Sequence, residues 1–285
     1  MKETYLIICN PKAGKGKSLN LLKELEGFLT RKGIEHETWQ LAFPEDLNKY
    51  SCVIIIGGDG TVNYVLNHFK NILIPIALIK GGTGNDYASL HLGNISYEKQ
   101  FEVAIQPKSI AVDAGLCNHK IFINGVGIGF DGWVVKKNIG KRFFSGITAY
   151  YSTIISLLLF YKESTIKIIT PEESWEQPTF MMSVAKGKTY GGGFKVAPGA
   201  HPCNGHFDFI TIGKIGLFNR FRFLPIIEKG KHLSLPFVKC VAAKKIEVIA
   251  SHPLQAHLDG EWMESAKFEL EIMPKKYLIK SIKYQ

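Results

Sequence analysis

Residues 52–63 have the sequence CVIIIGGDGTVN, in which an uncharged, β-branched run leads directly into a glycine-rich turn. A similar stretch follows at residues 74–86, IPIALIKGGTGND, where an apolar run again ends in a glycine-rich turn. Apolar runs of this length that end in glycine are typical of the buried strands of a parallel sheet. Open α/β sheets bind their ligands at the carboxyl ends of such strands. The two stretches therefore predict an α/β domain with a ligand site at its two turns.

Both turns combine glycines with an acidic residue. Glycine permits positive φ angles and lets backbone N–H groups come close to a phosphate. Asp59 lies in the first turn and Asp86 ends the second. A carboxylate suits a phosphate site when Mg²⁺ binds between the two negative groups. We therefore predict a metal-nucleotide site, in preference to the alternative of two ordinary strand-to-helix turns.

The segments around these turns alternate between strand and helix patterns. A first strand is predicted at Tyr5–Cys9, and a basic loop at residues 10–17 leads into a helix that ends near Gly33. The apolar residues of this helix recur at the spacing of one buried face and are Leu21, Leu22, Leu25, Phe28 and Leu29. Further strands are predicted at Glu37–Leu41 and Ile110–Asp113. This alternation predicts a mostly parallel sheet with right-handed crossovers.

After Gly115 the pattern changes to short alternating strands separated by Gly, Pro and Asn, which predicts an antiparallel, sandwich-like second domain. The predicted strands are Lys120–Asn124, Thr165–Thr170, Phe180–Val184, Phe207–Ile212, Lys244–Ala250, Gln255–Leu258 and Phe268–Ile272. One helix is predicted at Phe143–Tyr161, which contains no charged residue. Its serines, threonines and tyrosines favour a buried or lipid-facing helix over a membrane span. The last residues, Tyr277–Tyr284, suit one more strand.

The composition limits the classes of partner and compartment. The chain has 285 residues and a formal net charge of +10, which favours anionic partners such as nucleotides and acidic membranes. Zinc-finger spacing, RNA-binding aromatic motifs and a long basic tail are all missing from the sequence, so no nucleic-acid partner is predicted. The five cysteines are odd in number and contain no CxxC pair, which is typical of a reduced, cytoplasmic protein. No stable protein partner is inferred, and a homodimer stays open.

Several motifs carry a resemblance to a known family. Gly57–Asn63 resembles the GGDGT-x-N signature of the diacylglycerol kinase catalytic-domain family, in its bacterial soluble lipid-kinase form. Gly81–Asp86 resembles that family's G-[GTS]-x-N-D signature, in place of which NAD kinases carry a different segment. Asn10–Gly14 resembles the family's N-P-x-[AS]-G loop, and residues 259–261 match its D-G-E motif. The segments at residues 122–131 and 191–200 are similar to two further family motifs, so the resemblance runs from about residue 4 to 262.

The resemblance implies a lipid kinase that depends on ATP and Mg²⁺ and works at the inner face of the membrane as a peripheral protein. It implies a nucleotide-binding domain over residues 1–115, to which residues 276–285 return, and a sandwich-like lipid domain over residues 116–275. The residues expected at the nucleotide are Asn10, Gly14, Thr38, Gly57, Gly58, Asp59, Gly60, Thr61, Asn63, Gly82, Thr83 and Asn85. Those expected at the metal are Asp59, Asp86 and Asp113.

The D-G-E motif implies the catalytic pair. A lipid hydroxyl is a weak nucleophile near neutral pH, and a carboxylate within hydrogen-bond reach can accept its proton as the phosphoryl group moves. Glu261 is expected to be this base, with Asp259 as close support. Taken alone, D-G-E would more often be a β-turn, and Asp113 is equally well interpreted as a cap or turn residue.

Two alternatives and one departure remain. The chain could phosphorylate a soluble substrate such as NAD, or bind nucleotide as a regulator without turnover. The identity of the lipid, among diacylglycerol, sphingoid bases, phosphatidylglycerol and polyprenols, stays open.

The family usually has an Asp in D-G-x-[LF]-D that ligates a structural Mg²⁺, whereas this chain has Asn204 there. A neutral amide is a weaker ligand for a hard cation, so this structural metal is in doubt.

Overall fold

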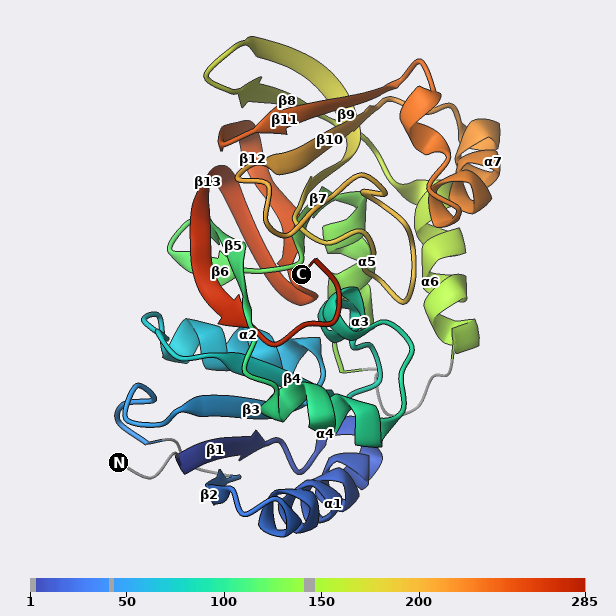
Figure 1. Ribbon diagram of the computed structural model, residues 1–285. Helices are drawn as coiled ribbons and strands as arrows, with labels where there is room; N and C mark the ends of the chain where they lie inside the picture. The colour runs from blue at the N-terminus through green and yellow to red at the C-terminus, as the bar shows by residue number, and fades with distance from the viewer. Residues whose placement is uncertain (1–3, 41–43, 141–146, 285) are drawn as a thin grey trace. The chain divides into compact units, whose positions relative to one another are not determined.

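The computed structural model describes residues 4–40, 44–140 and 147–284. These residues divide into two compact units, whose elements are labelled in Figure 1. The first unit contains the described residues up to Ala114 and those from Pro274 onward. The second unit is Gly115–Met273.

The first unit is built on a parallel sheet. Its strands are β1 (Thr4–Cys9), β2 (Glu35–Trp39), β3 (Cys52–Gly57) and β4 (Ile76–Lys80), in the order β2-β1-β3-β4. All three pairings are parallel, and Ile279 adds a further parallel bridge beside Ile76. The whole of β3 is buried, as expected for an uncharged run inside a covered sheet. The predicted mostly parallel sheet is confirmed.

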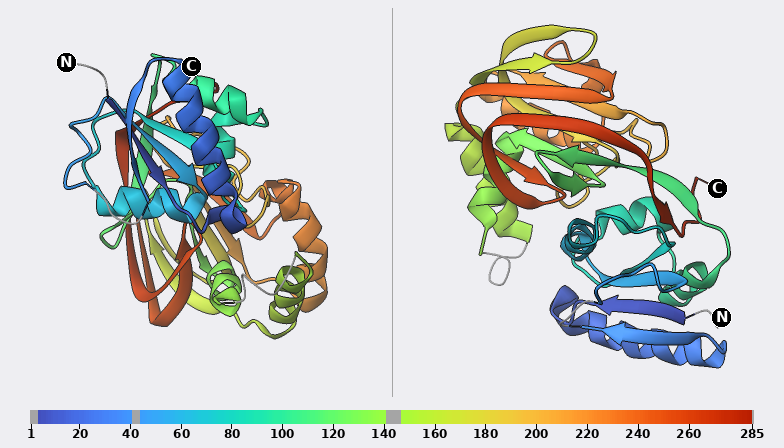
Figure 2. Two further views of the ribbon diagram at one scale, coloured as in Figure 1. Left: turned by 90° about the horizontal axis from the view of Figure 1, so that it is seen from below. Right: turned by 90° about the vertical axis from the view of Figure 1, so that its left-hand side faces the viewer.

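Four α-helices belong to this unit: α1 (Lys17–Arg31), α2 (Asp59–His68), α3 (Asp86–Leu92) and α4 (Tyr97–Ile105). The leucine-rich face of α1 packs with Phe101 of α4 on alternate residues of β1, β3 and β4. Figure 2 shows α2 on the other side of the sheet from α1. After α1, Gly33 has a φ of +70°, so the predicted helix stop is confirmed.

The second unit is an antiparallel sheet structure. It contains β6 (Lys120–Phe122), β7 (Gly125–Gly129), β8 (Ser164–Ile169), β9 (Ser174–Ala185), β10 (Phe207–Gly213), β11 (Val238–Ala243) and β12 (Lys245–Leu258). Two strands, β5 (Ile110–Cys117) and β13 (Glu261–Ile279), contribute residues to both units. The path runs β11-β10-β9-β7-β12-β13, and β8 pairs with both β9 and β12. These pairings are antiparallel, as predicted.

The predicted strand lengths need correction here. Lys244–Ala250 and Gln255–Leu258 were expected as separate strands, but both belong to β12, whose pairing with β13 shifts register between Ile249 and Leu254. A β-bulge lets one long strand pass through polar, bend-like residues without ending. The predicted last strand is likewise the end of β13, which stops at Ile279.

Among the described residues of this unit, three α-helices cover one side: α5 (Phe130–Asn138), α6 (Ile147–Phe160) and α7 (Leu217–Glu228). Of these, α5 and α7 were not predicted. The helix predicted at Phe143–Tyr161 is α6, and residues 143–146 of that prediction lie outside the described residues. Within the described ranges, none of the helices has both the length and the apolar character needed to cross a membrane.

Candidate active site

Three loops of the first unit meet at the carboxyl ends of β1, β3 and β4. The Asn10 side chain donates a hydrogen bond to Thr61 Oγ1 at 3.0 Å, and the Asn10 N–H donates to the carbonyl of Ile56 at 3.1 Å. Ser18 is buried, and its hydroxyl donates a hydrogen bond to the Asn10 carbonyl at 2.6 Å. The structure therefore brings the Asn10 loop against the turn after β3, as expected if both line one nucleotide site.

The glycines of these loops are in close contact. A Cβ atom at Gly82 would lie 2.3 Å from Gly58 Cα, and one at Gly14 would lie 2.4 Å from the Gly81 carbonyl oxygen. Gly14 also has a φ of +58°, which favours glycine. Any side chain at Gly14 or Gly82 would therefore push the loops apart. The glycine content of the motifs has a steric cause that the sequence alone did not reveal.

The acidic and amide residues of the turns organise local backbone. Asp59 accepts hydrogen bonds from the N–H groups of Asp86 and Tyr87, each at 3.0 Å, and so caps α3. Asn85 closes the second turn on itself through two 2.9 Å hydrogen bonds with Gly82. Thr83 remains exposed at the tip of that turn. Asp59 and Asn85 thus shape the loops, and α2 begins inside the first turn with the positive end of its dipole there.

The remaining predicted nucleotide residues differ in their surroundings. Gly57, Gly60 and Thr61 belong to the first turn and the start of α2, whereas Asn63 lies two residues further on and its side chain accepts a hydrogen bond from Asn67 at 3.2 Å. Thr38 lies on the edge strand β2, and its hydroxyl donates to Glu26 of α1 at 2.7 Å. The structure therefore ties Thr38 to a helix rather than to the three loops.

The three carboxylates predicted at the metal do not form a ligand group. Asp113 is 2% exposed and accepts the N–H of Lys275 at 3.0 Å, which holds the returning end of the chain. Among the described residues, no three His, Cys, Asp or Glu side chains gather closely enough to hold a metal ion. Asp59, Asp86 and Asp113 are thus not brought together as a protein-only magnesium site.

The D-G-E motif forms a tight hairpin turn between β12 and β13. Asp259 and Gly260 have φ angles of +48° and +89°, which suit a two-residue type I′ turn, and Leu258 pairs with Glu261 across it. The Asp259 carboxylate accepts three backbone N–H groups at 2.9 Å, from Ile123, Asn124 and Gly125. Asp259 is therefore a positioning residue that locks the turn, and Glu261 remains exposed beside it.

A polar group next to this hairpin was only partly visible in the sequence. Tyr190 donates a hydrogen bond to Asp131 at 2.9 Å, and its ring packs edge-on against His257 at 5.2 Å. Burial raises the pKa of Asp131 to about 7 and lowers the pKa of His257 to about 4. His257 Nδ1 lies 3.3 Å from the N–H of Gly260, so this group supports the D-G-E turn. Asp131 belongs to a family-like motif, but no spacing signal links it to Tyr190 and His257.

A lysine stands where the resemblance implies a structural magnesium ion. Lys186 is fully buried, and its ammonium donates to Asn204 Oδ1 at 2.7 Å and to the His206 carbonyl at 2.8 Å. Burial raises the pKa of nearby Asp208, and the charges of His206 and Lys186 oppose that shift. An ammonium group that already binds these oxygens does not fit a metal site, so no Mg²⁺ is assigned there.

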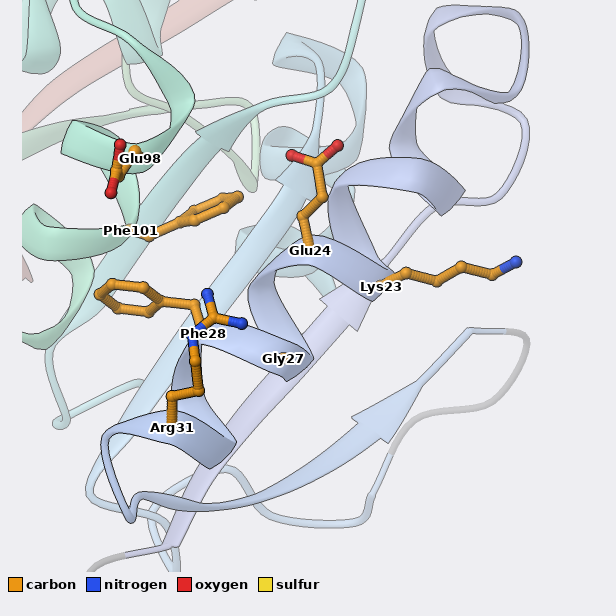
Figure 3. A pocket seen from close by; sticks show the side chains of 7 residues that line it. All are labelled: Lys23, Glu24, Gly27, Phe28, Arg31, Glu98 and Phe101. Atoms are coloured by element: carbon orange, nitrogen blue, oxygen red, sulfur yellow. The ribbon is translucent and has the colours of Figure 1, made fainter.

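The surface hollow between α1 and α4 is a separate feature (Figure 3). It has a volume of about 290 Å³. Its lining residues are Lys23, Glu24, Gly27, Phe28, Arg31, Glu98 and Phe101. Figure 3 shows Lys23 pointing away from the hollow, whereas the rings of Phe28 and Phe101 lie next to each other, with their centroids 5.8 Å apart. None of the seven is a predicted site residue, so the hollow is separate from the predicted nucleotide site.

Known proteins share both units. Residues 4–117 match the family described as diacylglycerol kinase catalytic domain, and residues 124–279 match the YegS C-terminal NAD kinase beta sandwich-like domain. YtlR of Bacillus subtilis is 26% identical over 97% of this chain and 99% of its own length. The diacylglycerol kinase of Staphylococcus carnosus is 26% identical over 92% of this chain and 90% of its own.

Solved structures agree on the fold. A diacylglycerol kinase from Bacillus anthracis superimposes with a TM-score of 0.74 and 20% identity, covering 99% of this chain and 97% of that one. An NAD kinase from Archaeoglobus fulgidus in complex with ATP matches with a TM-score of 0.57 and 15% identity, covering 99% and 94%. These likenesses confirm the predicted α/β domain and sandwich-like second domain. The two matched families and the relatives named diacylglycerol kinase show that this chain is a kinase and belongs to the diacylglycerol kinase catalytic-domain family.

Proposed function

We propose that this kinase transfers the γ-phosphoryl group of ATP to the hydroxyl group of a lipid. The observation that carries the proposal is the meeting of the three glycine-rich loops in the first unit. Side chains at Gly14 and Gly82 would collide with the neighbouring loop, so glycine at these positions lets the loops meet at one edge of the sheet, where backbone N–H groups can bind phosphate oxygens. The N-terminus of α2 adds a favourable dipole for those oxygens.

Magnesium enters this proposal with the nucleotide. Mg²⁺ usually keeps several waters and binds one or two carboxylates together with substrate phosphates, so a three-carboxylate cage is not required. Bound in that way, it would neutralise charge on the phosphates. Of the predicted ligands, Asp86 is half-buried at the start of α3, and Asp59 accepts two backbone N–H groups there. We propose these two carboxylates of the glycine-rich turns as the protein groups that meet such an ion or its waters.

Glu261 is the proposed general base. It is exposed at the first position of β13, where it can receive a proton from an acceptor hydroxyl. The turn before it is fixed by the three hydrogen bonds to Asp259 and by the His257 contact, so the backbone of Glu261 is held in place. In this proposal the hydroxyl oxygen bonds to the γ-phosphorus, the bond from the γ-phosphorus to the β–γ bridging oxygen breaks and releases ADP, and the hydroxyl proton moves to the Glu261 carboxylate.

Diacylglycerol is the acceptor that the relatives suggest first, because the Staphylococcus carnosus protein carries the name diacylglycerol kinase. Sphingoid bases, phosphatidylglycerol and polyprenols offer the same hydroxyl chemistry. A soluble substrate is the second candidate, since the NAD kinase from Archaeoglobus fulgidus shares the fold. We favour the lipid because the Gly81–Asp86 signature resembles that of lipid kinases.

The test is transfer of labelled γ-phosphate from ATP, with Mg²⁺, to a panel that contains each lipid class and NAD. Wild type is compared with Glu261→Gln, with Asp59→Asn, and with Glu271→Gln, an exposed glutamate on the same strand as Glu261. We expect a labelled lipid from wild type and Glu271→Gln, and a rate lower by about 10²–10⁴-fold in Glu261→Gln. Label on NAD alone would replace the lipid assignment. Nucleotide binding with no labelled product would favour a regulator without turnover.

A further inference from the structure

Among the side chains of α6 that the structure describes, the exposed ones are two serines, Ser152 and Ser156, and three large apolar groups, and none is charged. The apolar groups are Ile155, Leu159 and Phe160, which are 47%, 45% and 78% exposed, and the four-residue spacing of Ile155 and Leu159 places these two on one helix face. The opposite face, which includes Ile154 and Leu158, is buried in the core of the second unit. A helix at a water-facing surface normally carries charged or polar residues on its outer face. The outer face of α6 therefore suits a surrounding other than water.

The start of α7 continues this apolar surface. Leu217, Phe218 and Phe221 are 45%, 85% and 38% exposed, whereas Phe223 and Ile227 point into the same core that holds α6. Phenylalanine is seldom left this exposed without a function, because burying it is strongly favourable.

A buried arginine holds the two apolar segments side by side. Arg220 of α7 donates to the carbonyls of Leu158 and Tyr161 at 2.8 and 2.9 Å, at the carboxyl end of α6. It also pairs with Glu163 at 2.7 Å, and both charged side chains are at most 9% exposed. Figures 1 and 2 show α6 and α7 next to each other in the second unit. We call the resulting surface the α6–α7 face, made of Ile155, Leu159, Phe160, Leu217, Phe218 and Phe221.

The charges that border the α6–α7 face are positive. Lys162, Lys214 and Arg222 are exposed directly beside its residues in the chain. Of the two acidic residues in and directly after α6 and α7, Glu163 is neutralised by Arg220, and Glu228 lies at the opposite end of α7 from Leu217 and Phe218. Exposed aromatic and aliphatic groups bordered by basic side chains suit the headgroup region of an anionic bilayer.

We propose that the α6–α7 face docks the kinase on an anionic membrane surface. The inference rests on the proposed function, because a lipid acceptor lies in a bilayer. A second copy of the chain is a poorer occupant, since a two-fold contact through this face would bring the same three cations together from both copies. The apolar side chains would enter the interface and the cations would meet lipid phosphates.

The test is sedimentation with sucrose-loaded vesicles, without nucleotide or added acceptor, so that binding is read independently of catalysis. Vesicles of phosphatidylcholine with about 30% phosphatidylglycerol are compared with vesicles of phosphatidylcholine alone. The anionic lipid gives the vesicle surface a negative potential that attracts basic residues. We expect wild type to bind the anionic vesicles and to lose affinity as salt is raised. Phe218→Ser with Phe221→Ser should weaken binding about tenfold or more, and Arg222→Gln about fivefold.

Matched controls come from the first unit. Leu73→Ser removes an apolar side chain that is 75% exposed, and Lys70→Gln removes an exposed cation. Neither change should alter vesicle binding. Phe218 is 85% exposed, so Phe218→Ser alone should leave the thermal unfolding midpoint unchanged, whereas Phe221 is 38% exposed and its loss should lower the midpoint. A loss of vesicle binding in Phe218→Ser with an unchanged midpoint is therefore assigned to the surface.

The outcomes separate this inference from the proposed function. Vesicle binding lost in the phenylalanine variant, with phosphotransfer to detergent-dispersed lipid retained, supports both. Vesicle binding that depends on the α6–α7 face while no lipid is ever phosphorylated supports the docking surface and removes the proposed function. Equal binding by wild type and variant, or none by wild type, overturns the docking surface. So does a wild-type dimer in size-exclusion chromatography that the phenylalanine substitutions convert to a monomer.

Discussion

Gly82 lies against Gly58 so closely that a Cβ atom added at Gly82 would be 2.3 Å from the Gly58 Cα atom. This contact joins the two glycine-rich turns, which are separated by a strand and a helix in the sequence. The requirement for glycine at position 82 is therefore steric and does not arise from its φ angle.

We expect Gly82→Ala to lower the free energy of unfolding by about 1–3 kcal/mol and to abolish most ATP binding, because the added methyl group must move one loop away from the other. Gly27→Ala is the control. Gly27 lies inside α1, where an added Cβ makes only an ordinary contact, 3.5 Å from Arg31. That change should stabilise by about 0.5–1 kcal/mol. Urea denaturation and ATP titration of both variants check the prediction, and normal ATP affinity in Gly82→Ala would contradict it.

We expect substitutions at Asp259 and Glu261 to differ in their effects on the free energy of unfolding. Asp259→Asn replaces a carboxylate that accepts three backbone N–H groups with an amide that has one acceptor oxygen, so we expect a loss of about 2 kcal/mol. Glu261→Gln changes an exposed side chain and should keep wild-type stability while losing phosphotransfer. Thermal unfolding and rate measurements on both variants test this. Equal destabilisation by the two changes would mean that Glu261 also has a structural role.

Asp131 should make stability depend on pH. Burial raises its pKa in the folded protein to about 7 from the ordinary value of 3.8, so the folded state holds a proton that the unfolded state has released. The stability gained from this group is fully present below about pH 4 and is lost as pH rises through 7. Asp131→Asn has a neutral amide at this position, so its stability does not fall through ionisation of this side chain. We expect the variant to gain roughly 2 kcal/mol relative to wild type between pH 5 and pH 8.

His257 also makes stability depend on pH, and its lowered pKa acts in the opposite direction to the raised pKa of Asp131. Burial lowers that pKa to about 4, so its contribution is lost as pH falls below the ordinary value of 6.5. Both proteins retain His257, and its effect cancels in the difference between them. A difference that stays constant with pH would show that Asp131 is ionised throughout.

Lys186 should supply the stability that a metal ion would otherwise give to the Asn204–His206 loop. Lys186→Met leaves the Asn204 and His206 oxygens without their buried donor, and we expect it to cost about 2 kcal/mol or more. The midpoint of thermal unfolding of the ligand-free wild type should not change when EDTA is added. A fall of several degrees with EDTA would restore the structural metal.

The sequence was most informative where structure is set by neighbours along the chain. Apolar runs predicted β3 and β4, and the leucine spacing predicted α1 with its stop at Gly33. The same local signals failed for α5 and α7. In α7 the aromatic residues and Pro225 mask any helical period, and burial of Arg220 and Phe223 against α6 stabilises the helix instead. Tertiary packing overrides weak local preference in such segments.

The residues of the site also fall into two groups, those predicted from local sequence and those identified only in the folded chain. Motif residues such as Gly58 and Gly82 were identified from local sequence, but the contact between them was not, because it depends on how two parallel strands align. Lys186 carries no sequence signal at all, since a lysine is normally expected at the surface. Its role depends on oxygens of residues 204 and 206, which only the folded chain brings to it. Thr38, expected at the nucleotide, turned out to be bonded to Glu26.

The return of the chain's end to the first unit has a consequence for synthesis. Tyr277 and Ile279 are each 1% exposed, and the bridge from Ile279 to Ile76 lies beside β4. The ribosome makes these residues after the whole of Gly115–Met273. N-terminal domains usually fold first during synthesis, but the core of this first unit is completed only after the second unit has been made. A nascent chain that stops near Met273 would carry a finished second unit and a first unit whose β4 edge is open to pairing with other chains.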